Sequence, residues 1–132
     1  MNDATALLSS ALAARGNAVC GYSHYAVGAA IETDDGRIVT GCNIENATFG
    51  LTMCAERVAL FKGLSEGCRR FVRIAIAADG PRTVRPCGAC RQLLWEFAGD
   101  IDVLTTGLDG NLERRRMRAL LPDPFDGNDI AR

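Results

Sequence analysis

The alternation of apolar and polar positions predicts a chain of short helices and strands. An amphipathic first helix is predicted by four apolar residues that share one face at helical spacing: Leu7, Leu8, Ala11 and Leu12. Asp3 or Thr5 is its candidate cap, and Gly16 ends it. Residues 27–33 and about 37–44 are typical of two strands, joined by a turn at residues 34–36. The start of the chain is therefore predicted to form a helix and a β-hairpin.

The centre of the chain predicts two more helices with a strand between them. Residues from about 53 to 65 are apolar on nearly all sides of a helix, which is typical of a helix buried in the middle of a domain. Residues 71–78 are almost continuously apolar, as in a central strand covered on both faces. A third helix is predicted from about residue 87, and Gly99 ends it. Its inward face is expected to carry three apolar residues: Leu93, Leu94 and Phe97.

The C-terminal part of the sequence predicts the remaining strands of a sheet. Residues 101–105 are typical of a strand and residues 112–116 of a possible edge strand, before a short helical turn at 117–121. This order of elements predicts an α/β fold, a three-layer α/β/α sandwich around a mixed sheet of about five strands. The length of 132 residues suits a single domain over residues 1–132.

Composition narrows the expected partners and compartment. The formal net charge of −1 supplies no overall field that would attract nucleic acid or an anionic membrane. The chain start lacks the pattern of a signal peptide, and no apolar run reaches transmembrane length. Six cysteines in such a chain favour reduced thiols over a disulfide framework. We therefore expect a cytoplasmic protein with no membrane and no nucleic-acid partner.

One basic cluster bears on that expectation. It consists of Arg114, Arg115, Arg116 and Arg118. Such a cluster would suit contacts with the phosphates of a polynucleotide. A solvated charged face is the simpler interpretation in a chain whose net charge is −1.

Two cysteine motifs carry the candidate chemistry. Cys54 stands two residues before Glu56, and Cys87 and Cys90 form a Cys-x-x-Cys pair about thirty residues later. Three protein ligands suit a catalytic zinc, which keeps its fourth position open for water. Glu56 would lie beside the metal without binding it, where a proton-carrying base is needed.

Other interpretations of these motifs remain open. A Cys-x-x-Cys pair also occurs as a redox pair or as half of a structural zinc site. A structural site normally has a fourth Cys or His, and the single histidine, His24, lies outside any pairing motif. Glu56 could equally form a structural ion pair with an arginine. An open zinc site with Glu56 as the base is the favoured hypothesis.

The neighbours of the cysteines bear on their charge. Both motifs fall at predicted helix N-termini, where free backbone N–H groups favour thiolates. Three thiolates on a divalent cation leave a net charge of about −1, which weakens the attraction of the metal for water. Arg57 is the natural cation to offset this charge, unless it is an exposed helix arginine. Gln92, with Arg91, could also donate to thiolates or face solvent.

Taken together, these residues resemble the small zinc-dependent cytidine deaminases of pyrimidine salvage. The match runs in order through five segments: residues 22–30, 41–46, 54–57, 86–92 and 120–125. The resemblance implies zinc on Cys54, Cys87 and Cys90, with Glu56 as the proton shuttle. The implied reaction converts cytidine and deoxycytidine to uridine and deoxyuridine with release of ammonia.

The resemblance also implies a set of substrate contacts. Asn43 and Glu45 match the pair that holds the ribose 3′-hydroxyl, and their two-residue spacing independently places both side chains on one face of a strand. Alone, that spacing would suit any solvated strand. The backbone around Ala55 matches the segment that recognises the pyrimidine, and Tyr25 matches an aromatic residue packed against the nucleoside. Phe125 matches an aromatic residue that reaches a neighbouring subunit's base, which implies a homotetramer.

Several positions depart from the usual family pattern and leave the exact substrate open. Tyr25-Ala26 replaces the common Phe-Pro, Phe49-Gly50 the common Tyr-Pro, and Arg85 a frequent small residue. The alternatives are a deaminase of a modified or antibiotic cytosine nucleoside, of the blasticidin S type, and a non-catalytic zinc-stabilised binding module. The remaining cysteines are expected to be free and dispensable for zinc, with Cys42 the most buried: Cys20, Cys42 and Cys68.

Overall fold

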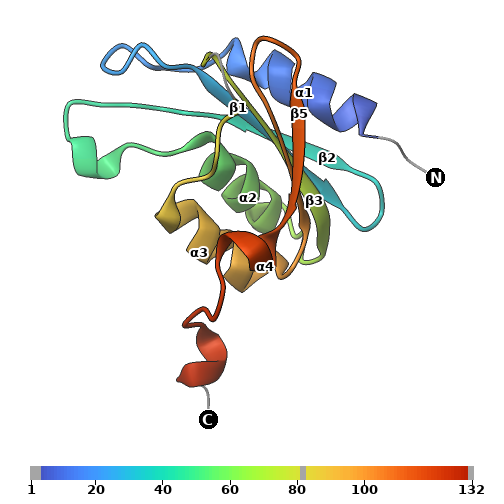
Figure 1. The fold of residues 1–132 in the computed structure, drawn as a ribbon. Coiled ribbons are helices and arrows are strands. Elements are labelled where there is room, and N and C mark those ends of the chain that lie inside the picture. Colours follow the sequence, from blue (N-terminus) through green and yellow to red (C-terminus); the bar gives the residue numbers. More distant parts are fainter. Residues whose placement is uncertain (1–3, 81–82, 131–132) are drawn as a thin grey trace.

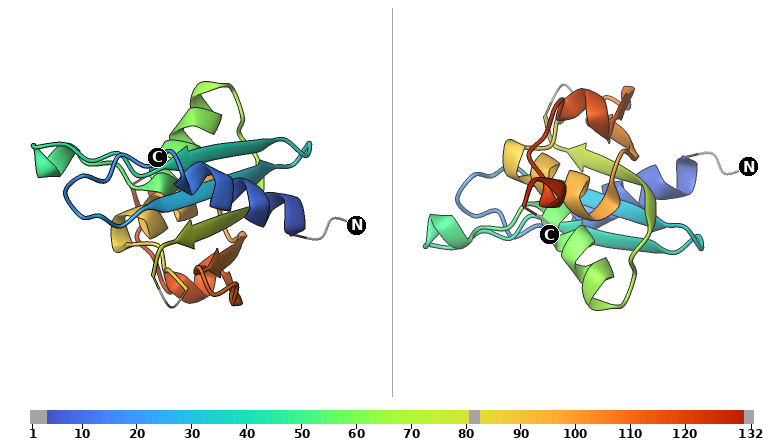
Figure 2. Two further views of the ribbon diagram at one scale, coloured as in Figure 1. Left: turned by 90° about the horizontal axis from the view of Figure 1, so that it is seen from above. Right: turned by 90° about the horizontal axis from the view of Figure 1, so that it is seen from below.

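The computed structural model describes residues 4–80 and 83–130 and shows a mixed sheet with helices on both faces (Figures 1 and 2). The elements in chain order are α1 (Thr5–Arg15), β1 (Val27–Thr33), β2 (Ile38–Cys42), η1 (Phe49–Leu51), α2 (Ala55–Ser65), β3 (Phe71–Ala78), α3 (Gly88–Ala98), β4 (Asp102–Thr106), β5 (Leu112–Arg116), α4 (Met117–Leu120) and η2 (Gly127–Asp129). The strand order is β2-β1-β3-β4-β5, with β3 and β4 parallel and the other neighbours antiparallel. The predicted three-layer sandwich around a five-stranded mixed sheet is confirmed.

The sheet separates two apolar cores. On one face, Leu7 and Ala11 of α1 pack against Ala30, Ala75 and Leu104 of the central strands. On the other face, α2 and α3 contribute Leu60 and Leu94 to a larger core with residues of the sheet. All seven residues of β1 are buried because helices cover both of its faces. The same double cover explains the nearly continuous apolar sequence of β3.

Two glycines let helices lie directly on the strands. A Cβ atom at Gly28 of β1 would lie 2.0 Å from the carbonyl oxygen of Ala11 in α1. A Cβ at Gly41 of β2 would lie 2.5 Å from the backbone nitrogen of Ala59 in α2. Only glycine therefore fits at either position, and the backbones of α1 and α2 are fixed against opposite faces of the sheet.

Most predicted elements are confirmed, and β1 and β3 have the predicted bounds. Two expectations about burial are wrong. Phe97 lies in the last turn of α3 and is 42% exposed, because helical spacing sets the direction of a side chain but not how far its neighbours extend to cover it. Likewise α2 is not buried all round, since Phe61 and Lys62 face away from the sheet and are exposed.

No helix in the described residues has the length and apolar character that crossing a membrane requires.

Candidate metal centre and substrate cavity

Three thiols from two helices converge on one point. Cys54 is the N-cap residue of α2, Cys87 is the N-cap residue of α3, and Cys90 lies in the first turn of α3. The Cys54 sulfur lies 3.8 Å from that of Cys87, which lies 3.5 Å from that of Cys90. All three sulfurs are within 4.8 Å of one another and none forms a disulfide. Three sulfur donors at this spacing fit a tetrahedral zinc with one position left for another ligand.

The guanidinium of Arg57 lies beside this cluster, as predicted. Its Nη2 donates to the Cys54 sulfur at 3.4 Å and to the backbone oxygen of Thr52 at 3.3 Å. A hydrogen bond from Cys90, helped by the one from Arg57, lowers the pKa of Cys54 to about 5. The contact with Cys54 and burial raise the pKa of Cys90. The contacts among the thiols and with Arg57 thus favour a thiolate in this cluster.

Glu56 is a buried carboxyl group next to these thiols. It occupies the first turn of α2, is 5% exposed, and lines the same cavity as Cys54 and Cys87. Burial raises the pKa of Glu56 to about 7. A carboxyl group with such a pKa can both accept and release a proton near neutral pH.

Cys54, Cys87 and Glu56 line a cavity of about 280 Å³. Glu45 and Ser23 line the same cavity. The rest of its lining is mostly apolar and comes from four segments of the chain: Tyr25, Val27, Asn43, Thr52, Met53, Ala55, Val84 and Arg85. A metal cluster and a carboxylate on one cavity suit a ligand that carries both a reactive group and a hydroxyl group.

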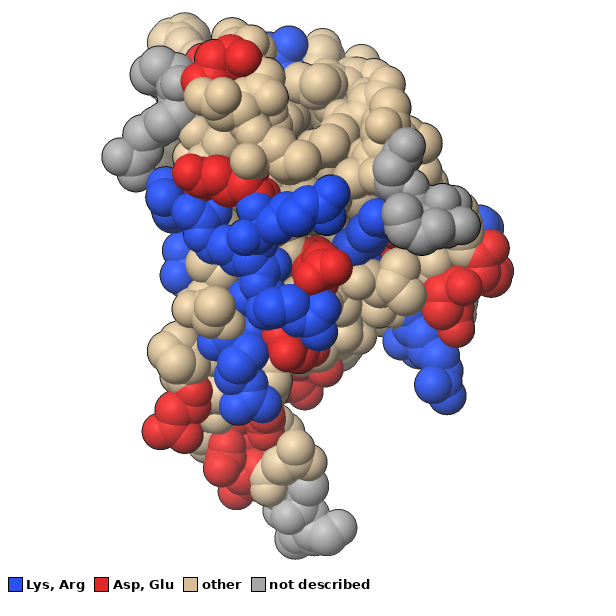
Figure 3. Space-filling model, turned by 45° about the vertical axis from the view of Figure 1, so that its right-hand side comes forward, with Lys and Arg blue, Asp and Glu red and all other residues tan. Residues whose placement is uncertain are grey.

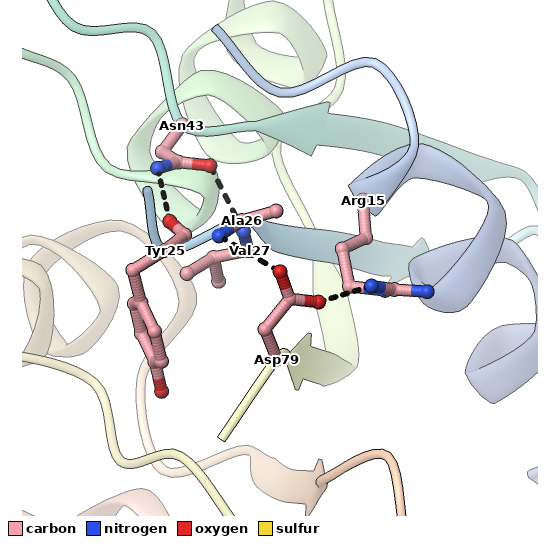
Figure 4. Close-up of polar contacts among 6 residues, drawn as sticks. All are labelled: Arg15, Tyr25, Ala26, Val27, Asn43 and Asp79. Carbon is pink, nitrogen blue, oxygen red and sulfur yellow. Dashed lines mark hydrogen bonds and ion pairs between the residues drawn. The ribbon is translucent and has the colours of Figure 1, made fainter. Parts of the chain in front are cut away.

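The structure places Asn43 and Glu45 side by side but gives them different surroundings. Asn43 is 7% exposed, and its amide binds backbone: Nδ2 donates to the Tyr25 oxygen at 2.8 Å and Oδ1 accepts from the Val27 nitrogen at 2.9 Å (Figure 4). Asn43 Nδ2 also lies 3.2 Å from a carboxylate oxygen of Glu45. The amide of Asn43 therefore fixes the wall of the cavity as well as its neighbour.

Glu45 is held as a carboxylate by a residue that the sequence analysis did not single out. Ser23 donates to it twice, from its backbone nitrogen at 2.9 Å and from its hydroxyl at 2.5 Å. The Tyr22 nitrogen adds a third bond at 3.1 Å. These hydrogen bonds, those from Ser23 first, lower the pKa of Glu45. The only sequence signal for Ser23 is its place within the segment 22–30 that carries the family resemblance.

Two expected site residues lie away from this cavity in the single chain. Phe125 is 64% exposed and is not among the residues that line the cavity. Gln92 donates from Nε2 to the backbone oxygen of Phe125 at 2.6 Å, and so holds the C-terminal segment instead of a thiolate. Arg91 also binds backbone, donating to Pro86 at 2.7 Å and to Leu120 at 2.9 Å. The helix that carries Cys90 therefore also anchors the C-terminal segment.

The other three cysteines lie outside the cluster, but their predicted order of burial is wrong. Cys68 is buried and accepts from Arg37 Nη2 at 2.6 Å, whereas Cys42 and Cys20 are partly exposed. Cys42 lies on the edge strand β2, on the side of the strand that is covered only in part. Alternation along a strand gives the face of a residue but not how completely a helix covers that face.

Replacing Cys42 with alanine should leave one zinc per chain, because its sulfur is not part of the cluster. Cys87→Ala is the comparison variant. It should reduce bound zinc at least tenfold, since it removes one of the three proposed ligands. Metal analysis of both purified variants would check this. Loss of zinc from folded Cys42→Ala would show that the ligand set is assigned wrongly.

Comparison with known proteins points to one family with a zinc-binding region. Residues 1–105 match the family model described as the cytidine and deoxycytidylate deaminase zinc-binding region. A cytidine deaminase of Halalkalibacterium halodurans is 46% identical over 129 residues, which cover 97% of this chain and 98% of that one. A crystal structure of cytidine deaminase from Burkholderia pseudomallei superposes with a TM-score of 0.91 at 42% identity, covering 94% of this chain and 100% of that chain.

A blasticidin-S deaminase of Bacillus cereus is a more distant relative, 34% identical over 111 residues, which cover 77% of this chain and 78% of that one. The family model, the relatives over nearly the full length and the three-cysteine cluster agree with the resemblance seen in the sequence. The chain therefore belongs to the cytidine and deoxycytidylate deaminase family that shares this zinc-binding region.

Proposed function

We propose that this chain deaminates cytidine and deoxycytidine to uridine and deoxyuridine, releasing ammonia. The observation that carries the proposal is the cluster of three thiols beside a buried Glu56, on a cavity that the Glu45 carboxylate also lines. The cofactor is zinc, and Cys54, Cys87 and Cys90 would hold it. When bound, zinc makes a water molecule acidic enough to act as a nucleophile near neutral pH.

Glu56 is the proton carrier of this proposal. Its carboxylate would take a proton from the attacking water and deliver it to N3 of cytosine. It would then take the second proton from the oxygen added at C4 and deliver it to the amino group, which leaves as ammonia when the C4–N bond breaks. The pKa of about 7 supports this role, because neither protonation state is strongly disfavoured at neutral pH. Arg57, next to Cys54, would offset the negative charge of the thiolates.

The part of the cavity lined by Glu45 would bind the sugar. Glu45, ionised and held by Ser23, can accept a hydrogen bond from a ribose hydroxyl. Asn43 would assist both directly and by holding the backbone at Tyr25. Tyr25 would pack against the nucleoside, and the backbone at Ala55, which also lines the cavity, would contact the pyrimidine.

We further propose that the enzyme is a cytoplasmic homotetramer in which Phe125 completes the site of a neighbouring subunit. The exposure of Phe125 and its distance from its own cavity support this assembly. The free state of all six cysteines, which lie in the described residues, supports a reducing compartment.

A small-molecule substrate is favoured over a polynucleotide. Figure 3 shows a band of basic side chains with acidic side chains among them. Arg115 pairs with Glu113 at 2.7 Å, and Arg116 pairs with Asp102 at 2.9 Å. The Arg118 guanidinium lies 4.5 Å from the centre of the Trp95 ring. Arginines engaged in this way offer phosphates a weaker attraction than an unpaired cluster would.

Comparing substrates tests the proposal. Cytidine and deoxycytidine should be deaminated with kcat/KM values at least about tenfold above that for blasticidin S, because Glu45 is placed for a sugar hydroxyl. Loss of cytidine absorbance together with ammonia release measures the reaction, with single-stranded DNA as a negative control. A higher kcat/KM for blasticidin S would favour the antibiotic-modifying alternative. No turnover of any of them by zinc-loaded protein would favour a binding module.

A further inference from the structure

Tyr25 and Val27 line the cavity, and the backbone from Tyr25 to Val27 is held by the side chains of Asn43 and Asp79 (Figure 4). Asn43 binds the two outer residues of this segment, the oxygen of Tyr25 at 2.8 Å and the nitrogen of Val27 at 2.9 Å. Ala26 lies between them, and Asn43 makes no hydrogen bond to it. Its backbone groups must therefore be bound from elsewhere.

Asp79 supplies both bonds to Ala26. Its backbone nitrogen donates to the Ala26 oxygen at 3.2 Å, and its carboxylate oxygen Oδ2 accepts from the Ala26 nitrogen at 3.4 Å. Asp79 directly follows the last residue of β3, so it extends the pairing between β3 and β1 by one residue. Its other carboxylate oxygen, Oδ1, forms an ion pair with Nη1 of Arg15 (Figure 4).

Arg15 is itself placed by a backbone contact. It is the last residue of α1, and a Cβ at Gly28 would lie 2.4 Å from its backbone nitrogen. The end of α1 is thus seated on β1 one residue beyond Val27. Arg15 and Asp79 consequently join the ends of α1 and β3 at the point where the cavity wall enters β1.

This ion pair has no part in the chemistry described above. Neither Arg15 nor Asp79 lines the cavity, and their side chains are 28% and 33% exposed. Ion pairs with this exposure contribute little to global stability, because solvent screens them. The local effect of the Arg15–Asp79 pair is different. Arg15 orients the Asp79 carboxylate, which binds Ala26 between the two residues held by Asn43.

We propose that Asp79, oriented by Arg15, is a positioning residue for nucleoside binding. It fixes Ala26, and through Ala26 it keeps Tyr25 against the cavity and the amide of Asn43 beside Glu45. The inference rests on the proposed function only for its kinetic readout. A second readout, amide hydrogen exchange, is independent of activity.

Asp79→Ala should raise KM for cytidine about five- to tenfold, leave kcat within about twofold, and leave one zinc per chain. Arg15→Gln should raise KM about two- to fourfold, because Asp79 would remain but lose its orientation. Asp102→Ala is the matched control, since it removes another exposed ion pair, with Arg116, beside the start of β3, whereas Asp79 follows the end of that strand. It should leave KM unchanged.

Hydrogen exchange distinguishes positioning from a failure of the proposed function. In Asp79→Ala the amides of Ala26 and Val27 should exchange at least about tenfold faster, whether or not cytidine is the substrate. Unchanged exchange at both amides would overturn the inference. An unchanged KM for an active enzyme, or an equal loss of kcat and zinc content, would also overturn it.

Proline at position 26 provides a rescue test. Ala26 does not have a positive φ, and its N–H has the Asp79 carboxylate as its partner. Proline has no N–H to satisfy and restricts φ by itself. In an Ala26→Pro background, the increase in KM caused by Asp79→Ala should therefore fall below about twofold. A full five- to tenfold increase in that background would show that Asp79 does not act through Ala26.

Discussion

Replacing Glu56 with glutamine is expected to lower kcat for cytidine by about 10³-fold and to leave bound zinc unchanged. Glutamine has nearly the same shape but cannot accept and release a proton in the way a carboxyl group does. Loss of a positioned general acid–base typically costs about 10²- to 10⁴-fold in rate. Because Glu56 serves two proton transfers in the proposed reaction, we expect the upper part of that range.

The measurement compares wild type and Glu56→Gln side by side, with cytidine absorbance, ammonia release and zinc content followed in each. Glu66→Gln is a suitable control, because this exposed glutamate caps the other end of α2. Full activity of Glu56→Gln would refute the proton-carrier role. Loss of zinc along with activity would indicate that Glu56 acts by maintaining the metal site.

Replacing Gly41 with alanine is expected to lower the free energy of unfolding by about 3 kcal/mol, at the upper end for an overpacked core. The added Cβ would lie 2.5 Å from the backbone nitrogen of Ala59 and 2.7 Å from the oxygen of Ala55. Backbone atoms cannot rotate away as the end of a side chain can, so α2 must move off the sheet. Since Cys54 caps this helix, zinc affinity should fall as well.

Urea unfolding of zinc-loaded protein measures the effect, with Gly50→Ala as the control. A Cβ at Gly50 would meet no atom within 4 Å. The unfolding free energy of Gly50→Ala should therefore differ from that of the wild type by less than about 1 kcal/mol. A change of similar size in both variants would mean that Gly41 is not required for the seating of α2.

The sequence predicted the elements whose pattern is local. The bounds of β1 and β3 follow from apolar runs that end at polar residues or glycine, and the convergence of the cysteines follows from their positions at two helix N-termini. Helix and strand periods are properties of neighbouring residues, so they can be recognised without the tertiary structure.

What the sequence did not predict depends on contacts between distant residues. The burial of Cys42 and Phe97 is set by how far other elements extend over them. Gln92 binds the backbone of Phe125, 33 positions away, and Asp79 pairs with Arg15 across 64 positions. No periodicity in the chain indicates such partners. The motif around Cys87 and Cys90 likewise gives no sign that Gln92 binds the backbone of Phe125 and not a cysteine.

The division of the proposed zinc ligands between two helices has a consequence for biosynthesis. Cys54 and Cys87 are 33 positions apart, so at a synthesis rate of about 5–20 residues per second Cys54 leaves the ribosome roughly two to seven seconds before Cys87. During that interval β1 and β2 have left the ribosome and α2 is emerging, but only one of the three clustered sulfurs is present. A metal can therefore meet all three sulfurs only after Cys90 has emerged, and until then Cys54 meets oxidants without its partner thiols.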